Sequence, residues 1–265
     1  MRNMVMPLLS NEISKAVRTK LPYFGLFAAA LVCLLIFAVA DQVGDREQLN
    51  AWGYVSLSMQ SVFSDIGLIC VVVFAAIVVS EETGGKTVRA VLSSAVLRRE
   101  FYVAKVLIAI FYALLLSVFS VVLSACLAAV RYEFGDICDD IGLVYSRTQV
   151  LSNFLLALLL SWLPLTATVL YGIFISTVIS KPGPAVAVAV ASVYLIDFTK
   201  HLIGIDPYVI TRYLGLPWAV FHQVANGVGC EWTPAAWKII AVSLAYIVLV
   251  FGAGLVVFSK KDLNV

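Results

Sequence analysis

The sequence predicts an all-α integral membrane protein that crosses the bilayer as a bundle of about six helices. Of its 265 residues, 62% are hydrophobic and only 13% are charged, and the mean hydropathy is +1.00. Soluble domains are roughly half apolar and about a quarter charged, so this chain lacks the charged surface that a water-soluble fold needs. The net charge of +2 gives no reason to expect a nucleic-acid partner.

Six apolar runs are long enough, or nearly so, to cross a bilayer, since a helical span needs about 20 apolar residues. They are residues 21–40, 57–80, 103–130, 151–180, 185–198 and 239–259. The fifth run is short and follows Pro182 and Pro184, which can begin a helix but cannot continue one. The whole chain, residues 1–265, is therefore predicted to be a single transmembrane domain with both termini on the same side.

The distribution of lysine and arginine predicts the orientation of the spans. If the N-terminus is cytoplasmic, 12 of the 18 lysines and arginines lie on the inner side, and the acidic residues lean toward the outer side. Loops on the cytoplasmic side of membrane proteins carry the excess of positive charge. We therefore expect a multi-pass protein of the inner or plasma membrane with both termini in the cytoplasm.

Two connections differ from simple loops. Residues 81–102 form a charged segment on the predicted inner side, and residues 199–238 form an outer segment that is still rich in apolar side chains. A fully solvated loop would not keep so many exposed apolar residues. The outer segment therefore fits either a re-entrant hairpin that dips into the outer leaflet or a pair of amphipathic helices on the membrane surface.

The inner segment has the pattern of a short amphipathic helix between two spans. Gly84 and Gly85 interrupt the preceding helix, and residues 87–94 place apolar and basic side chains on different faces. Such a helix suits docking into a groove on a soluble partner, and a plain charged loop is the alternative. Lys105 follows at the start of the third span, where its long side chain is expected to reach the membrane surface.

Two motifs resemble nucleotide-binding or catalytic sequences but lack essential parts. Residues 85–87 read Gly-Lys-Thr, like the end of a phosphate-binding loop, but Ser80 replaces the required glycine and no strand precedes the motif. The double glutamate that begins at Glu81, together with His222 and Asn226, suggests an intramembrane protease. These groups are expected at opposite membrane faces, too far apart to share a catalytic water. With only two histidines in the chain, no catalytic residue, metal or cofactor is predicted here.

Polar residues within the predicted spans are candidates for a transport pathway. Asp65 lies in the second span and either contacts a cation or substrate or lies too near the surface to matter. Asp197 lies near the end of the fifth span, with Lys200 three residues later as a salt-bridge partner. In the fourth span, the polar side chains near Pro164 either line the bundle interior or bond neighbouring helices. These side chains are Thr166, Thr168 and Tyr171.

Two of the five cysteines, Cys138 and Cys230, fall on the predicted outer side. An oxidising exterior permits a disulfide between them. Such a bond would tie the loop between the third and fourth spans to the outer segment, in a structural role.

Three segments share a pattern with a known family. The inner segment has an acidic residue, glycine, threonine, arginine and leucine in order, followed by an arginine and by a lysine that enters the next helix. A charged stretch from Glu12 to Lys20 precedes the first span, and the last span closes with Phe-Ser-Lys-Lys-Asp-Leu at residues 258–263. These features resemble the ABC-2 type permeases, the transmembrane subunits of ABC transporters.

The resemblance implies an elbow helix before the first span and a coupling helix within residues 81–102. The coupling helix would contact a separate ATPase subunit, with Thr87 as a cap of the helix. The residues expected to meet the ATPase are Glu82, Lys86, Thr87, Arg89 and Leu92. Two ATPase subunits would bind ATP and Mg²⁺, while this chain would bind no cofactor and would pair with a second copy or a sister permease. ATP binding would push on residues 82–94 and rock the two bundles about a pathway near the midplane.

Three functions are consistent with these features. The first is the membrane subunit of an ATP-driven exporter, which is not itself an enzyme. The second is an ATPase-coupled membrane protein that transmits force to an outer-face partner without moving a solute. The third is an intramembrane protease, which would require Glu81 and His222 to act together.

Overall fold

The computed structural model describes residues 5–43, 50–84, 97–139, 142–229 and 231–260. Within this part of the chain, six helices are long and apolar enough to cross a membrane. The structure therefore confirms the predicted all-α membrane bundle.

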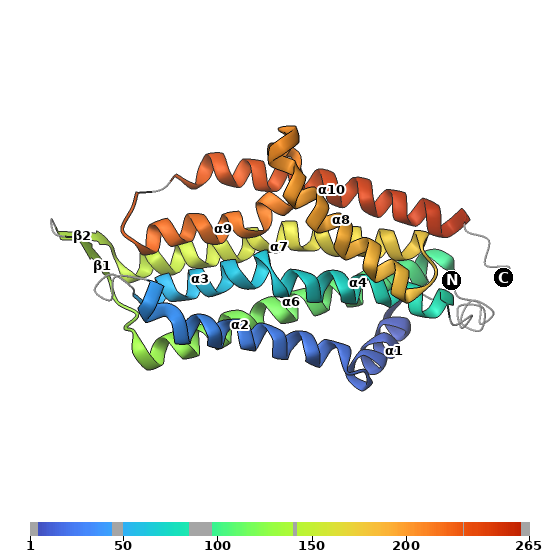
Figure 1. Ribbon diagram of the computed structural model, residues 1–265, viewed down its shortest axis with the longest axis horizontal. Helices are drawn as coiled ribbons and strands as arrows, with labels where there is room; N and C mark the ends of the chain where they lie inside the picture. Colours follow the sequence, from blue (N-terminus) through green and yellow to red (C-terminus); the bar gives the residue numbers. More distant parts are fainter. Residues whose placement is uncertain (1–4, 44–49, 85–96, 140–141, 230, 261–265) are drawn as a thin grey trace.

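The elements run mostly along the long axis of the molecule (Figure 1). In chain order they are α1 (Val5–Arg18), α2 (Leu21–Val43), α3 (Ala51–Ser64), α4 (Ile66–Gly84), α6 (Arg98–Arg131), β1 (Ile137–Asp139), β2 (Gly142–Tyr145), α7 (Arg147–Val178), α8 (Pro182–Ile203), the short 3₁₀ helix η1 (Asp206–Tyr208), α9 (Ile210–Ala225) and α10 (Trp232–Lys260). The antiparallel β1–β2 hairpin lies at one end, which we call the hairpin end. The other end, where α1, the last turn of α4 and the first turn of α6 lie, is called the α1 end.

The second predicted span, 57–80, is two helices and not one. α3 begins at Ala51, where the side chain of Asn50 accepts a hydrogen bond from the backbone N–H of Gly53 at 2.7 Å. The helix breaks at Asp65, whose φ of −128° and ψ of −103° lie outside the helical region. α4 then continues toward the α1 end (Figure 1). The second span is therefore discontinuous.

The outer segment 199–238 contains the end of α8, the short helix η1, the helix α9 and the start of α10. α8 runs past the predicted end at residue 198 to Ile203, and Gly204, with a φ of +74°, ends the helix in the left-handed conformation that glycine adopts readily. After η1, α9 continues toward the hairpin end (Figure 1). Trp218 and Phe221 of α9 are fully buried, so this helix packs inside the bundle and does not lie on its surface.

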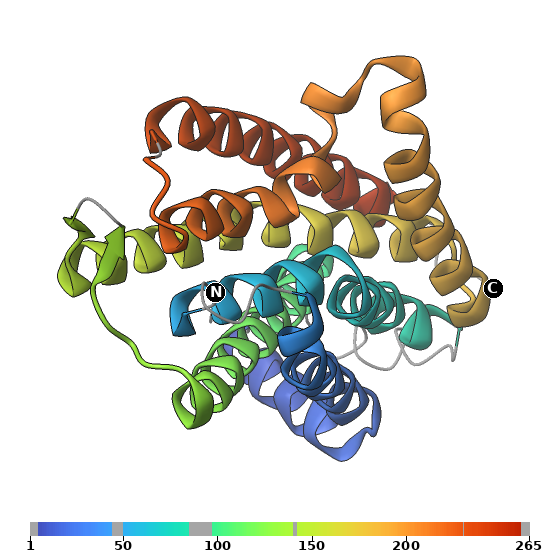
Figure 2. The same ribbon diagram turned by 60° about the vertical axis from the view of Figure 1, so that its left-hand side comes forward.

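α7 occupies the middle of the bundle and packs against α4, α9 and α10. Figure 2 shows it between α9 and α10 on one side and the helices α3, α4 and α6 on the other. α7 and α4 approach closely at Gly172, where a Cβ atom would lie 2.8 Å from the Cβ of Ala75 and 3.3 Å from the carbonyl oxygen of Val72. Small residues permit such close helix packing in membranes.

We expect Gly172→Leu to lower the free energy of unfolding by about 1–3 kcal/mol, because the new side chain would push α7 away from α4. The measurement is unfolding of the purified protein in detergent by increasing SDS. Gly252→Leu on α10 is the matched control, since a Cβ atom there would meet no atom within 4 Å. An equal loss of stability in both variants would show that the close approach of α7 and α4 does not depend on glycine at position 172.

Candidate functional site

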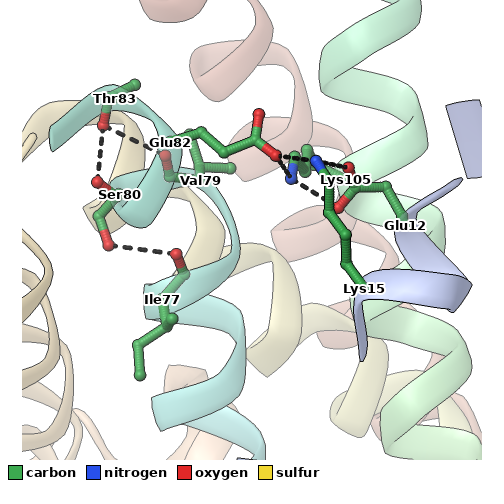
Figure 3. Close-up of polar contacts among 8 residues, drawn as sticks. All are labelled: Glu12, Lys15, Ile77, Val79, Ser80, Glu82, Thr83 and Lys105. Carbon is green, nitrogen blue, oxygen red and sulfur yellow. Dashed lines mark hydrogen bonds and ion pairs between the residues drawn. The ribbon is translucent and has the colours of Figure 1, made fainter. Parts of the chain in front are cut away.

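Four charged side chains from three elements meet at the α1 end (Figure 3). We call them the charge cluster: Glu12 and Lys15 of α1, Glu82 of α4 and Lys105 of α6. The ammonium of Lys105 lies 2.6 Å from a carboxylate oxygen of Glu12 and 2.7 Å from one of Glu82. The ammonium of Lys15 lies 3.1 Å and 2.6 Å from the same two carboxylates. Each carboxylate therefore contacts both lysines, and the four charges sum to zero.

The charge cluster is largely shielded from solvent. Lys105 is 2% exposed, and Glu12 and Glu82 are each 8% exposed. A buried charge is tolerated only when it is paired and hydrogen-bonded, and the cluster meets this condition with residues that are far apart in sequence. Lys105 therefore does not reach the membrane surface as the sequence suggested; it turns inward to two carboxylates, beside the ring of Phe101.

Lys15 is the more exposed lysine of the cluster, with 46% of its side chain accessible. Burial by itself lowers the pKa of this lysine, but hydrogen bonds to Glu82 and Glu12 outweigh burial and raise the pKa above its ordinary value of 10.5. While the two glutamates are ionised, the stability that Lys15 contributes is therefore fully present below its ordinary pKa of 10.5 and is lost only as the pH rises through the raised pKa. The cluster does not use Lys15 as a switch near neutral pH.

The ends of α4 and α6 are also tied to the rest of the bundle. The hydroxyl of Thr83 in the last turn of α4 donates to the carbonyl oxygen of Ser180, 3.2 Å away, in the connection between α7 and α8. Figure 3 shows Thr83 and Ser80 bonded within α4 beside the charge cluster. The guanidinium of Arg98 at the start of α6 donates to the carbonyl oxygen of Ser259 on α10 at 3.0 Å. Both helices that flank residues 85–96 are thus fixed in place.

The predicted ATPase-contact residues fall into two groups. Glu82 is buried in the charge cluster, so it connects elements within the fold and does not offer a free surface. Lys86, Thr87, Arg89 and Leu92 lie outside the described residues. Their predicted role stays a prediction.

A second polar site lies where the two discontinuous spans meet. We call it the junction pocket: a pocket of about 410 Å³ lined by the end of α3, the start of α4, and residues of α8, η1 and α9. The ammonium of Lys200 lies 2.6 Å from a carboxylate oxygen of Asp197 and 3.9 Å from one of Asp206. Asp206 also accepts a hydrogen bond from the guanidinium of Arg212. The predicted pair of Asp197 and Lys200 is therefore present, as part of a larger ionic group.

Asp65 lies at the helix break beside this pocket, where its backbone carbonyl accepts a hydrogen bond from the hydroxyl of Tyr194 at 3.1 Å. Thr168 and Tyr171 on α7 line a smaller neighbouring cavity that shares Thr211 with the junction pocket. The hydroxyl of Thr166 instead bonds back to its own helix. The structure thus gathers Asp65, Asp197 and two of the three α7 residues around one region.

Asp206, Thr211 and Arg212 also contribute to this site, although their roles were not predicted from the sequence. Their signal is an acidic residue just after Gly204, followed by a basic residue six positions later, in a segment that is otherwise apolar. The hydroxyl of Thr211 is buried and has no hydrogen-bond partner among the described residues. A polar group that lines a pocket and has no hydrogen-bond partner in the protein can form a hydrogen bond with a ligand in that pocket.

The residues of the protease hypothesis lie at opposite ends of the bundle. His222 is on α9, and its ring lies 2.7 Å from the hydroxyl of Ser56 on α3 and 3.1 Å from the amide of Asn226. Glu81 is near the end of α4, at the α1 end. His222 therefore joins α3 to α9, and it does not meet Glu81.

The predicted disulfide is not supported by the structure. Cys138 is a free, exposed cysteine at the hairpin end. Cys230 lies outside the described residues.

Comparison with known protein families identifies the family to which this chain belongs. The family described as ABC-2 family transporter protein matches residues 8–197, which is more than half of the chain. The matched region includes the whole charge cluster. Among curated proteins, no match is found.

Proposed function

The chain belongs to the ABC-2 family of transporter proteins, and from this premise we propose that it is the membrane subunit of an ATP-driven exporter. Permeases of this family work with ABC ATPase subunits. We propose that this chain pairs with a second copy or a sister permease, and that two separate ATPase subunits bind ATP and Mg²⁺. The excess of lysine and arginine supports a plasma or inner membrane location with cytoplasmic termini.

The charge cluster is the observation that carries this proposal. α4 ends at Gly84 and α6 begins at Arg98, so these two helices flank the residues expected to meet the ATPase. Glu82 and Lys105 join the two helices to each other, and Glu12 and Lys15 join both to α1. A push on the segment between α4 and α6 would therefore move α1, α4 and α6 as one unit. A stiff connection of this kind is what an ATPase-driven motion needs.

The junction pocket supports the transport part of the proposal. Transporters commonly place their substrate sites where discontinuous membrane helices meet, and here the breaks in the second and fifth spans lie together. The pocket holds two acidic and two basic side chains and the unpaired hydroxyl of Thr211. We propose that Asp65, Asp197 and this group line part of the pathway.

Transmission of force to an outer-face partner is the second candidate function. The observation that favours it is the β1–β2 hairpin, which projects from the bundle (Figure 1) and exposes Leu143 and Val144. In that case substitutions in the hairpin would impair function, and substitutions in the junction pocket would not.

Copurification with an ATPase subunit encoded nearby tests the coupling proposal. The solubilised wild-type chain should retain the ATPase, whereas Arg89→Glu and Leu92→Asp should each lose it. Lys260→Glu is the matched control, because Lys260 is an exposed cation on the same end of the bundle. If no ATPase copurifies with the wild-type chain while its bundle stays folded, the proposal that a separate ATPase drives this chain is contradicted. If Lys260→Glu loses the ATPase to the same extent, binding depends on the overall positive charge of this end of the bundle and not specifically on residues 85–96.

A further inference from the structure

A groove of about 630 Å³ lies beside the charge cluster, between the corner of α1 and α2 on one side and α4 and α6 on the other. One part of its lining is charged and the other is apolar. The charged part includes Arg18 and Lys20, at the corner where α1 ends and α2 begins. The apolar part is formed by Leu21, Phe74, Ile77, Val78 and Ile108.

The two parts of the lining follow the direction of α4. Glu81 and Glu82 are in the last turn at the α1 end, and Phe74 lies two turns deeper in the bundle, roughly 10 Å away at 1.5 Å per helical residue. The groove therefore changes from charged to apolar along the membrane normal. It is open to the outside of the fold and not an enclosed cavity.

The charges at the mouth of the groove leave an excess of one positive charge. Within the charge cluster the two lysines and two glutamates neutralise one another. Arg18 and Lys20 then face only Glu81 among the remaining charged residues of the lining. Both basic residues are exposed, and neither forms an ion pair with another residue of the described part of the chain.

We propose that this groove binds an anionic phospholipid, with its phosphate on Arg18 and Lys20 and one acyl chain along α4. A phospholipid has a charged head and an apolar chain in the order that the lining requires. Basic pockets between membrane helices bind anionic lipid head groups on the cytoplasmic side, and the distribution of lysine and arginine assigns this end to that side. A lipid in the groove would touch α1, α4 and α6 together and would help to hold α1 against the charge cluster.

The apolar part of the groove decides between a lipid and a soluble ligand. A free phosphate would need only the two basic residues, and an ATPase subunit that approaches from water would leave the apolar lining uncovered. Ile77 and Val78 of α4 are partly exposed there, so they offer an acyl chain apolar surface to cover. An acyl chain is the occupant that uses both parts of the lining. This inference concerns the chain alone, so it stands or falls independently of ATPase coupling.

Native mass spectrometry of the detergent-purified chain, titrated with phosphatidylglycerol or with phosphatidylcholine, tests the proposal. Wild type should retain phosphatidylglycerol more tightly than phosphatidylcholine. The double variant Arg18→Gln, Lys20→Gln should weaken phosphatidylglycerol binding roughly tenfold or more, since each cation near an anionic head group contributes about fivefold. Val78→Trp, which fills the apolar part, should weaken the binding of both lipids.

The matched control is Arg99→Gln, Lys260→Gln, which removes two exposed cations at the same end but outside the groove. It should bind phosphatidylglycerol within about twofold of wild type, because neither residue lines the groove. Thermal unfolding of each variant checks that it is folded. The proposal is overturned if wild type does not distinguish the two lipids, if the control loses as much affinity as Arg18→Gln, Lys20→Gln, or if Val78→Trp binds normally. Displacement of bound lipid by free phosphate would also overturn it, in favour of a soluble ligand.

Discussion

Replacing Lys105 with methionine is expected to lower the free energy of unfolding by about 3–5 kcal/mol, the usual cost of removing one partner from a buried ion pair. The ammonium of Lys105 contacts both Glu12 and Glu82, and its side chain is only 3% exposed. Without it, two nearly buried carboxylates would share the partly exposed Lys15. The measurement is SDS unfolding of the purified chain, together with ATPase activity of the assembled complex.

Two further variants separate the loss of a charge partner from the loss of any lysine. Lys260→Met removes an exposed lysine at the same end of the bundle and should change the free energy of unfolding little. Adding Glu82→Gln to Lys105→Met removes one of the two carboxylates that would otherwise share Lys15, so the double variant should regain part of the lost stability. If the double variant is less stable than Lys105→Met, the charge cluster does not act as a paired unit.

In the assembled complex, Lys105→Met should uncouple ATP hydrolysis from movement of the bundle. The proposed route for force runs from the segment between α4 and α6 through Glu82 and Lys105 to α1. A variant that stays folded and still binds the ATPase, but shows normal transport, would contradict this route.

The six spans could be predicted from sequence because a helix that faces lipid must be apolar along most of its length. The same reasoning failed for α3, which was predicted to begin only at residue 57. Ser56 and Ser58 in this helix are fully buried, and the hydroxyl of Ser56 bonds to His222 on α9. A helix that packs against other helices can be polar, so an apolar run does not mark where it starts.

The partners in the charge cluster could not be predicted for a different reason. A lysine near the start of a membrane helix usually extends to the surface, and that is where the sequence placed Lys105. Glu12 lies 93 positions earlier in the chain, and no local pattern indicates that the two meet. The pairing depends on how α1 packs against α6, which is a property of the tertiary fold. By contrast, Asp197 and Lys200 are three residues apart in one helix, and their pairing followed from helical spacing.

Replacing Lys200 in the junction pocket with methionine is expected to lower both the stability of the protein and its transport activity. Lys200 is 8% exposed and is the cation between Asp197 and Asp206. We expect the free energy of unfolding to fall by about 2–3 kcal/mol, less than for Lys105 because the side chain of Asp197 is 46% exposed and can be hydrated. Lys238→Met on α10 is the control, since it removes an exposed lysine outside the pocket.

Stability alone cannot distinguish a pathway from a structural ion group, so the decisive comparison uses Lys200→Arg. Arginine keeps the positive charge between Asp197 and Asp206 and should preserve most of the stability, but its planar guanidinium has a different shape and hydrogen-bond pattern. If the junction pocket lines the pathway, Lys200→Arg should fold normally and still reduce ATP-dependent transport roughly tenfold, a factor that corresponds to about 1.4 kcal/mol. Normal transport by Lys200→Arg would make the ionic group a structural link between α8 and η1. The pathway would then have to lie elsewhere in the bundle, because the ion pairs of Lys200 would serve only to hold α8 and η1 together.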